Sequence, residues 1–428
     1  MISDCSQALA MDPKYLKALG RRATAYEKLG RLTEALNDYT SVCVLEGFRN
    51  EATMASPDRV LKELAAAKAK QMFASRTAAL PSDTFLTAYF DSFRAQPSHE
   101  SLVVSSDNKH ESVVLLRTAF DCVKLHSYKD ALDAVNKAIE VADFANDSFA
   151  AFALNLRGTI YFLMGRVDDA ISDIDNALQV IPQDVNSLIK RATLHMERNE
   201  IEKTIDIFSQ IEKSSPAHVD MFYHRGQVRF LTGDFQGAVD DYSASIENEK
   251  ENESSVYVHI QMAVAKYKLG DIASAEKKFK ESRSLFPDSP DVYNYHGEVL
   301  MDRQSFSDAL KCFDKAIEMC PTSPLPYVNK SILYVQWKQD INTAEQVCRE
   351  ALKVDPLCDL AYQHLGQLLC HLNRIDEAVD VYDKAAAVCR TENELMSIIS
   401  CREAALAQLH VAKTFPGLME ALRQSALA

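Results

Sequence analysis

The chain has few of the residues that interrupt regular structure, with 12 glycines and 13 prolines among 428 residues. Stretches in which β-branched residues alternate with polar ones are also scarce, which argues against a β-rich fold. Ala and Leu are frequent instead, and Glu, Lys and Asp are well represented, as is typical of helical proteins. We therefore expect an all-α protein.

Long apolar runs and paired cysteines are missing as well. No apolar run approaches the ~20 residues that span a bilayer, and no basic leader precedes a short apolar stretch with a cleavage site. The ten cysteines contain no CxxC pair and mostly fall at small apolar positions of helices. They are interpreted as reduced core thiols, in a chain that is soluble on its own.

The motifs of common catalytic sites are absent too. The sequence contains no GxxxxGK[ST], GxGxxG or HExxH, and its eleven histidines are scattered. A lone histidine on a helix, such as His195 or His224, more often packs than binds a metal. We expect no enzymatic activity, no cofactor and no metal.

The formal charge of −14 disfavours nucleic acid as a ligand, because phosphates require a basic face. Cationic polypeptides are more compatible partners.

A repeat of about 34 residues runs through the sequence. Pro182 and Pro216 lie 34 residues apart, as do Pro287 and Pro321. Numbered from the first helical residue, the eighth position of each repeat is small: Ala23, Ala119, Gly158, Ala192, Gly226, Ala263, Gly297, Ser331 and Gly366. The twentieth is mostly Ala, at Ala35, Ala131, Ala170, Thr204, Ala238, Ala275, Ala309, Ala344 (after one inserted residue) and Ala378. Bulky residues recur at the twenty-fourth, as Tyr39, Phe208, Tyr242, Phe279, Phe313 and Tyr382. This period and pattern predict a tetratricopeptide (TPR) superhelical solenoid of antiparallel helix pairs.

The repeat register divides the chain into four parts. Residues 1–48 hold half a repeat and one full repeat, which is interpreted as the remnant of an N-terminal domain that begins mid-repeat. Residues 49–111 form connector helices, with a cap expected at Ser56-Pro57, and a polar hinge from Arg94. Residues 112–412 carry eight repeats and a capping helix near Glu392 to Ala412, and 413–428 form a tail.

Two cations mark the first complete repeat. Lys17 and Arg21 lie one helical turn apart at positions two and six, where they can face a carboxylate. The segment KALGRRA resembles the dicarboxylate clamp of chaperone-adaptor domains, which hold the Glu-Glu-Val-Asp tails of cytosolic heat-shock chaperones. That resemblance implies that Lys17 and Arg21 are the last two cations of such a clamp. The alternative is an ordinary basic helix face.

Nearly the whole chain is similar to a second family. The segments VCVLEGF after the clamp repeat and FLTAYFDSF before the hinge, followed by eight repeats, resemble the seventy-kilodalton TPR receptor of the mitochondrial outer-membrane translocase. The resemblance implies an import receptor on the cytosolic face of that membrane. Its implied partners are chaperone-delivered precursors, especially hydrophobic carriers with internal signals, the heat-shock chaperones and other translocase subunits. The family's membrane anchor and first two clamp repeats are not in this sequence, which is interpreted as truncated.

The expected precursor site is the concave face, to which positions two, five, six and nine of each first helix are assigned. Its predicted apolar residues are Phe152, Tyr223, Tyr257, Ile260, Val264, Leu325, Val328 and Ile332. Asp220, Asp291, Glu298 and Asp302 are predicted to add negative charge beside them. An apolar groove with acidic flanks suits amphipathic cationic segments. In the alternative, a tightly wound superhelix closes over these residues as core.

A soluble co-chaperone or scaffold without a mitochondrial role is the second candidate function. The two quoted segments favour the import receptor.

Overall fold

The computed structural model describes residues 1–94, 111–142, 149–250 and 254–417, and all regular structure in these ranges is helical. The chain forms two compact units. Unit 1 contains Met1–Thr77, Tyr334–Lys353 and the residues from Leu357 onward, whereas unit 2 contains Ala78–Leu333 with Val354–Pro356. The expected all-α TPR solenoid is confirmed, while most of the predicted hinge and tail lies outside the described residues.

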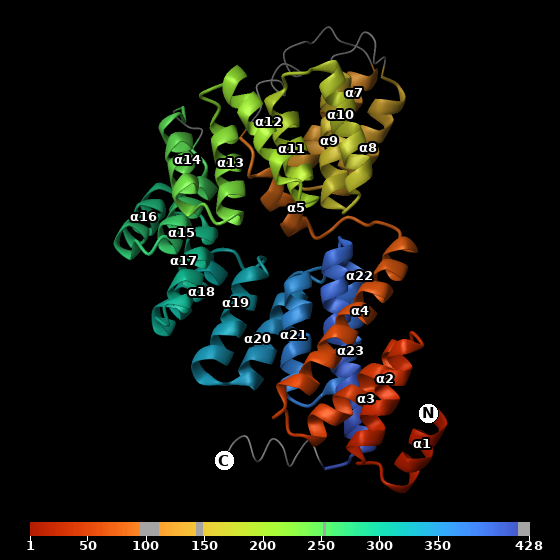
Figure 1. Ribbon diagram of the computed structural model, residues 1–428. Coiled ribbons are helices and arrows are strands. Elements are labelled where there is room, and N and C mark those ends of the chain that lie inside the picture. Colours follow the sequence, from red (N-terminus) through yellow and green to blue (C-terminus); the bar gives the residue numbers. More distant parts are fainter. Residues whose placement is uncertain (95–110, 143–148, 251–253, 418–428) are drawn as a thin grey trace. The chain divides into compact units, whose positions relative to one another are not determined.

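Unit 2 is a series of antiparallel helix pairs that pack consecutively (Figure 1). One short helix, α5 (Asp83–Phe90), precedes them. The paired helices are α7 (Glu111–Lys124), α8 (Tyr128–Glu140), α9 (Phe149–Leu163), α10 (Val167–Val180), α11 (Val185–Glu197), α12 (Ile201–Ser214), α13 (Val219–Leu231), α14 (Phe235–Glu247), α15 (Val256–Lys268), α16 (Ile272–Leu285), α17 (Pro290–Asp302) and α18 (Phe306–Met319), followed by α19 (Leu325–Leu333).

The small eighth position and the bulky twenty-fourth position touch in the pairs that contain Gly226, Gly297 and Gly366, as the repeat pattern predicts. A Cβ atom added to Gly297 would lie 2.5 Å from Cε1 of Phe313, and one added to Gly226 would lie 2.6 Å from Cε1 of Tyr242. Neither distance is compatible with a normal van der Waals contact. The ring therefore packs directly on the backbone of the first helix, which sets how closely the two helices approach.

Unit 1 combines helices from both ends of the chain. They are α1 (Ile2–Met11), α2 (Leu16–Lys28), α3 (Leu32–Leu45), α4 (Glu51–Ala74), the π-helix η1 (Tyr334–Lys338), α20 (Ile341–Val354), α21 (Asp359–His371), α22 (Ile375–Val388) and α23 (Glu392–Thr414). The predicted capping helix is α23, which begins with a capping box between Thr391 and Glu394. It packs against α3, α4 and α22.

The connector helix differs from its sequence prediction. It begins at Glu51, so Pro57 lies inside it rather than at its start. Val60 and Leu64 pack with Ala407 of α23 in one hydrophobic cluster, and Lys68 pairs with the buried Glu403 at 2.8 Å. These contacts group the last helices with residues 1–77, and not with the array that was expected to run from 112 to 412.

A π-helix accommodates the inserted residue of the seventh C-terminal repeat. The eighth and twentieth positions are 13 residues apart there, from Ser331 to Ala344, but 12 apart in the next repeat, from Gly366 to Ala378. A π-turn takes up one extra residue, and η1 lies between Ser331 and Ala344. Ser331 and Ala344 are consequently both buried at 0% exposure despite the insertion.

Charged residues also recur within the helix pairs. An arginine at position seven pairs with an aspartate at position 23 in three repeats, with shortest N–O distances of 2.7 Å in each: Arg22–Asp38, Arg157–Asp173 and Arg225–Asp241. Because the aspartates are almost fully buried, removal of one partner would leave an unpaired charge. The repeat therefore contains an ion pair that the sequence analysis did not identify.

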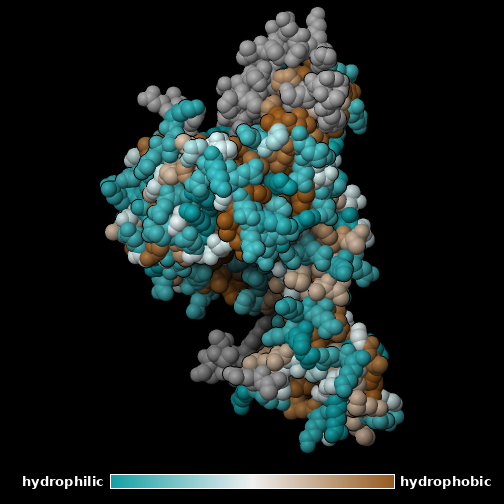
Figure 2. Space-filling model, turned by 45° about the horizontal axis from the view of Figure 1, so that its top comes forward, coloured by the Kyte–Doolittle hydropathy of each residue, from teal (hydrophilic) through white to brown (hydrophobic). Residues whose placement is uncertain are grey.

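The face in view in Figure 2 is largely hydrophilic, and its hydrophobic residues form separate patches. Among the described residues, no helix combines the length and apolar character that a bilayer crossing requires.

The contact between Gly297 and Phe313 leads to a stability prediction. Gly297→Ala places a methyl group against the ring and should lower the free energy of unfolding by about 1–3 kcal/mol, as overpacking does. In the Gly297→Ala/Phe313→Leu double variant the smaller side chain relieves the clash. Denaturant unfolding should therefore show a smaller loss than the sum of the two single variants. Wild-type stability of Gly297→Ala would contradict this packing.

Candidate functional site

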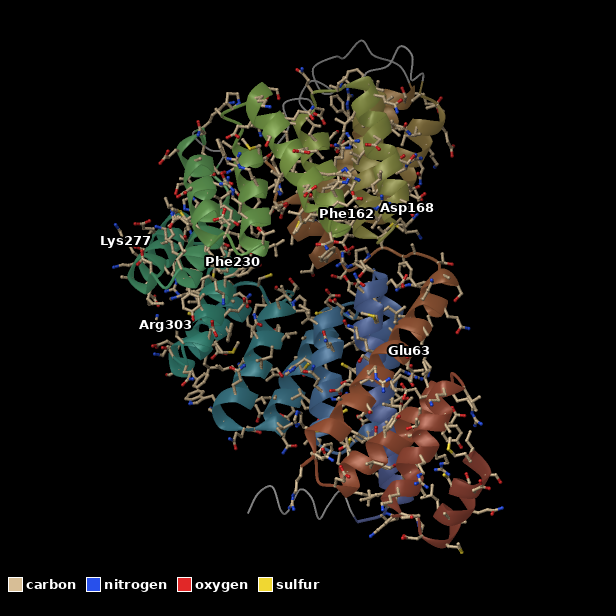
Figure 3. The ribbon with its side chains drawn as sticks, in the orientation of Figure 1. Glu63, Phe162, Asp168, Phe230, Lys277 and Arg303 are labelled. Carbon is tan, nitrogen blue, oxygen red and sulfur yellow. The ribbon has the colours of Figure 1, made fainter. Side chains whose placement is uncertain are left out.

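The short helix α5 carries the aromatic segment that precedes the first repeat of unit 2. Ser82 caps the helix by accepting a hydrogen bond from the amide of Phe85. Tyr89 lies against Phe162 of α9 at a ring-centroid distance of 5.9 Å, and Phe90 stacks on Tyr128 at 5.7 Å. Figure 3 labels Phe162. The helix is therefore attached to the repeats through its aromatic face.

The residues after α5 reach further repeats of unit 2. The ring of Phe93 stacks on His224 at 4.2 Å. Arg94 donates from Nη1 to Asp220 at 2.7 Å and also pairs with Glu249. These three charged side chains are at most 8% exposed. Their ion pairs are therefore shielded from water and attach the segment to α13 and to the residues that follow α14.

A cavity of about 820 Å³ lies beside this segment. Its volume is within the range of about 300–1,000 Å³ that is typical of ligand sites. We call it the α5 cavity. Its apolar lining is Phe90, Phe93, Phe120, Val123, Leu156, Val256 and Tyr257. Its polar lining is Asp91, Arg94, Lys124, His126, Tyr128, Asn155, Asn186, Lys190, Ser254 and Ser255. A lining that combines aromatic side chains with many polar and charged groups is suited to an amphipathic peptide.

Lys190 brings an unusual charge to the α5 cavity. Its amino group donates to Oδ1 of Asn155 at 2.7 Å and lies 5.1 Å from the ring centre of Phe93. Burial lowers the pKa of Lys190 to about 7, because the ammonium form loses its hydration. The charge of the cavity therefore changes close to neutral pH.

Tyr257 is the predicted groove residue that lines the α5 cavity. The side chain of Asp291 hydrogen-bonds to Tyr257, and burial raises the pKa of this carboxyl group. Both occupy position two of their repeats. The structure thus brings together one apolar and one acidic residue of the predicted site.

Three predicted groove residues belong to the core instead. Tyr223, Ile260 and Val328 are 2%, 0% and 5% exposed. All three occupy position five, which lies ~60° around the helix from position two and faces neighbouring helices. Their assignment to the groove surface was therefore incorrect.

The acidic flank also needs correction at Asp220, which is 1% exposed and bound to Arg94. Its charge is already neutralised by a residue outside the repeats.

The other predicted residues are distributed over the surface of unit 2. Phe152, Val264 and Ile332 are half-buried, Leu325 is 36% exposed, and Asp302 accepts a hydrogen bond from Tyr267 at 2.9 Å. Glu298 accepts hydrogen bonds from Asn294 at 2.9 Å and Asn329 at 2.7 Å, and burial raises its pKa. None of these residues lines the α5 cavity.

The sequence analysis missed the role of Phe90, Phe93 and Arg94 at this cavity. The available signal was the aromatic spacing of FLTAYFDSF, in which Phe85, Tyr89 and Phe93 recur every four residues. That spacing predicts one apolar helix face.

The two predicted clamp cations lie in unit 1. Lys17 and Arg21 are both exposed on α2, and neither has an ion pair or hydrogen bond to the described residues. The adjacent Arg22 is occupied, because its guanidinium donates to both oxygens of Asp38 at 2.7 and 2.8 Å. Of the two neighbouring arginines, Arg21 is therefore the one that can meet a ligand.

Comparison with known proteins identifies the family. Residues 260–324 and 338–391 match the tetratricopeptide repeat family model. The human mitochondrial import receptor subunit TOM70 is 32% identical over 434 residues, which cover 96% of this chain and 70% of the human protein. The chain belongs to the TOM70 family.

Other relatives agree with this assignment. The TOM70 subunit of Saccharomyces cerevisiae is 27% identical over 445 residues, 95% of this chain and 71% of the yeast protein. The crystal structure of yeast Tom70 has a TM-score of 0.68 and 26% identity, covering 99% of this chain and 88% of that chain. As a member of this family, the chain is a mitochondrial import receptor that acts at the outer membrane, and the second candidate function is not supported.

The depressed pKa of Lys190 predicts a pH-dependent stability. In the unfolded chain the pKa of a lysine is about 10.4. Between pH 7 and this value, Lys190 is therefore protonated in the unfolded chain but has lost its proton in the folded chain. The contribution of Lys190 to stability should therefore rise between pH 7 and 10. Denaturant unfolding of the wild type and of Lys190→Met is compared at pH 7 and at pH 9. The free energy of unfolding of the wild type, relative to that of the variant, should be about 2 kcal/mol higher at pH 9 than at pH 7. A pH-independent difference would contradict the lowered pKa.

Proposed function

We propose that the α5 cavity is where this receptor holds precursor polypeptides. The observation that supports the proposal is the volume of about 820 Å³ bordered by the aromatic side chains of α5, α7 and α15. Each apolar side chain of a ligand buried there contributes roughly 1.5–3 kcal/mol before ordering costs. Contacts of this kind tolerate many sequences, as a receptor for varied precursors requires.

The polar groups around the cavity favour amphipathic ligands. Asp91 and the nearby Asp291 supply negative charge. Lys124 supplies positive charge, and Lys190 adds a second positive charge below its pKa of about 7. A peptide helix with one apolar face can place that face against Phe120 and its polar face toward these groups. Precursors with internal hydrophobic signals have this character.

The second part of the proposal concerns chaperone tails. Lys17 and Arg21 are exposed cations one turn apart without partners in the described part of the chain, so they are available to an acidic peptide. We assign the Glu-Glu-Val-Asp tails of heat-shock chaperones to this pair. Two cations alone give weak binding, because an exposed charge pair contributes only ~0–1 kcal/mol.

A binding function, rather than an enzymatic one, completes the proposal. The relatives are named as receptor subunits. In the described ranges, no three His, Cys, Asp or Glu side chains are grouped to hold a metal ion.

Substitution in the cavity tests precursor binding. Val123→Asp places a carboxylate on the apolar wall of the α5 cavity and should weaken binding of a hydrophobic carrier-derived peptide by about 10- to 100-fold, the equivalent of one apolar contact. The matched control is Leu125→Asp, since Leu125 is 78% exposed and does not line the cavity. Fluorescence anisotropy measures the affinity, and circular dichroism checks folding.

Equal affinities of Val123→Asp and Leu125→Asp would place the precursor site elsewhere. If Val123→Asp fails to fold, Tyr257→Ala provides the same comparison from α15.

Titration with a Glu-Glu-Val-Asp peptide tests the clamp assignment. The chain should bind this peptide weakly, and Arg21→Ala should abolish binding, whereas Lys62→Ala removes an exposed cation of α4 and should have no effect. Added salt should weaken the interaction, because exposed ion pairs are screened. Micromolar affinity that survives Arg21→Ala in calorimetry would exclude the clamp.

A further inference from the structure

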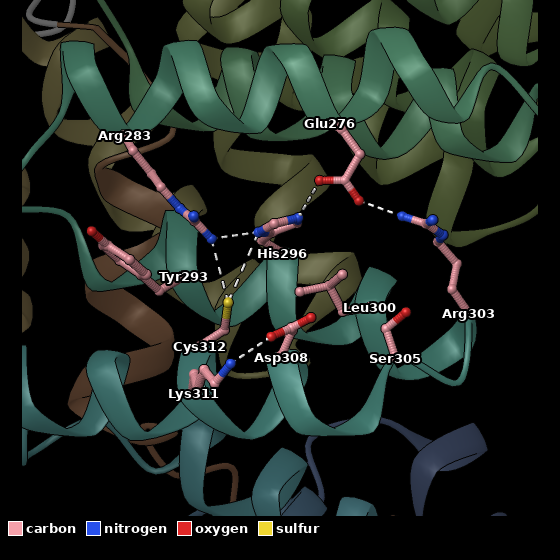
Figure 4. Close-up of a pocket in the computed structure, with 10 residues that line it drawn as sticks. All are labelled: Glu276, Arg283, Tyr293, His296, Leu300, Arg303, Ser305, Asp308, Lys311 and Cys312. Carbon is pink, nitrogen blue, oxygen red and sulfur yellow. Dashed lines mark hydrogen bonds and ion pairs between the residues drawn. The ribbon is translucent and has the colours of Figure 1, made fainter.

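A second cavity in unit 2, of about 490 Å³, contains an arginine that has no carboxylate partner among the residues the structure describes. Figure 4 shows its lining from α16, α17 and α18. The residues are Glu276, Arg283, Tyr293, His296, Leu300, Arg303, Ser305, Asp308, Lys311 and Cys312. We call it the Arg283 cavity, and it shares no lining residue with the α5 cavity.

The other charges of the Arg283 cavity are paired. Glu276 binds Arg303 and also accepts from Nε2 of His296 at 2.9 Å, and Asp308 pairs with Lys311 at 2.8 Å. The cavity thus contains three cations, Arg283, Arg303 and Lys311, but only two carboxylates in its lining. Both carboxylates already have cationic partners. Arg283 provides the remaining charge.

The contacts of Arg283 are with neutral groups. Nη2 contacts Nδ1 of His296 and donates to Sγ of Cys312 at 3.3 Å, while the guanidinium lies 4.7 Å from the ring centre of Tyr293. Burial lowers the pKa of His296 and raises that of Cys312, which keeps both groups uncharged at neutral pH. Nε of Arg283 is buried and has no hydrogen-bond partner in the described part of the chain.

A neighbouring repeat shows what normally accompanies an arginine here. In the repeat that begins at Val219, Arg225 at position seven binds Asp241 at position 23 and Glu212 at position 28 of the preceding repeat, at 2.7 and 3.0 Å. In the repeat that begins at Pro290, the same three positions hold His296, Cys312 and Arg283. The first set has one cation and two carboxylates, whereas the second has a cation and no carboxylate.

We propose that the Arg283 cavity binds a carboxylate-bearing ligand, with Arg283 as its anchor. A guanidinium presents parallel N–H groups to a carboxylate, and the unpartnered Nε–H of Arg283 is one of them. Tyr293 and Leu300 form an apolar wall for the rest of the ligand. An acidic side chain of a bound polypeptide and a small free dicarboxylate share this chemistry.

Calorimetric titration of the full chain tests the proposal. The probes are N-acetyl-Asp-Glu-amide, its uncharged analogue N-acetyl-Asn-Gln-amide, succinate and inorganic phosphate. We expect saturable binding of the acidic dipeptide, with no binding of the uncharged one. Arg283→Gln should reduce the affinity at least tenfold. Lys277→Gln removes a 79% exposed cation of the same helix α16, which lies outside the cavity (Figure 3), and should change nothing.

The two carboxylate probes distinguish the ligand's source. A higher affinity for the dipeptide than for succinate supports an acidic peptide segment as the ligand. A higher affinity for succinate supports a free dicarboxylate. Equal losses in Arg283→Gln and Lys277→Gln would overturn the proposal, since general charge attraction would then explain binding. Phosphate binding tighter than both carboxylates would overturn the assigned ligand class.

A measurement on the wild type remains decisive if Arg283→Gln does not fold. The dipeptide should slow alkylation of Cys312 by iodoacetamide, relative to Cys320 outside the cavity, as followed by peptide mass spectrometry. Unchanged alkylation of Cys312 at saturating dipeptide would refute the site.

Discussion

The contact between a small residue at position eight and a bulky one at position 24 is the constraint on which the solenoid depends. At Gly226, Gly297 and Gly366 even a methyl group would lie within 2.6 Å of the opposite ring, so these helix pairs pack at a fixed close approach. Repetition of that approach along the chain stacks the pairs. The first helices α7, α9, α11 and α15 all contribute residues to the α5 cavity.

This dependence explains what could be predicted from the sequence. The packing positions have strict size requirements, so they were recognisable without a structure, and even the inserted residue before Ala344 was evident before its π-helix was seen. Surface positions have no such requirement. Position five was assigned to the groove from the repeat register, together with positions two, six and nine. The ~60° between positions two and five turns Tyr223, Ile260 and Val328 toward neighbouring helices, where large apolar side chains are equally suitable.

The α5 cavity could not be derived from the repeat register, because a segment outside the repeats forms part of its lining. Arg94 and Asp220 are 126 residues apart in sequence, and their ion pair is buried. A repeat pattern describes contacts within and between repeats, and contains no information on such a long-range partner. The charge of Asp220 was therefore assigned to the ligand when it belongs to the attachment of α5. Similarly, Phe90 and Phe93 form part of the aromatic wall of the α5 cavity, and they lie outside the repeats.

Separation of packing from charge lets one backbone pattern provide different sites. Positions eight, 20 and 24 must keep their sizes, whereas positions seven, 23 and 28 can change their charges while the helices stay in place. Arg225 with its two carboxylates and Arg283 with its neutral neighbours occupy the same framework. In the first, the ion pairs are complete within the fold. In the second, burial keeps His296 and Cys312 uncharged. The guanidinium of Arg283 therefore has no carboxylate partner among the described residues and is available to the carboxylate of a ligand.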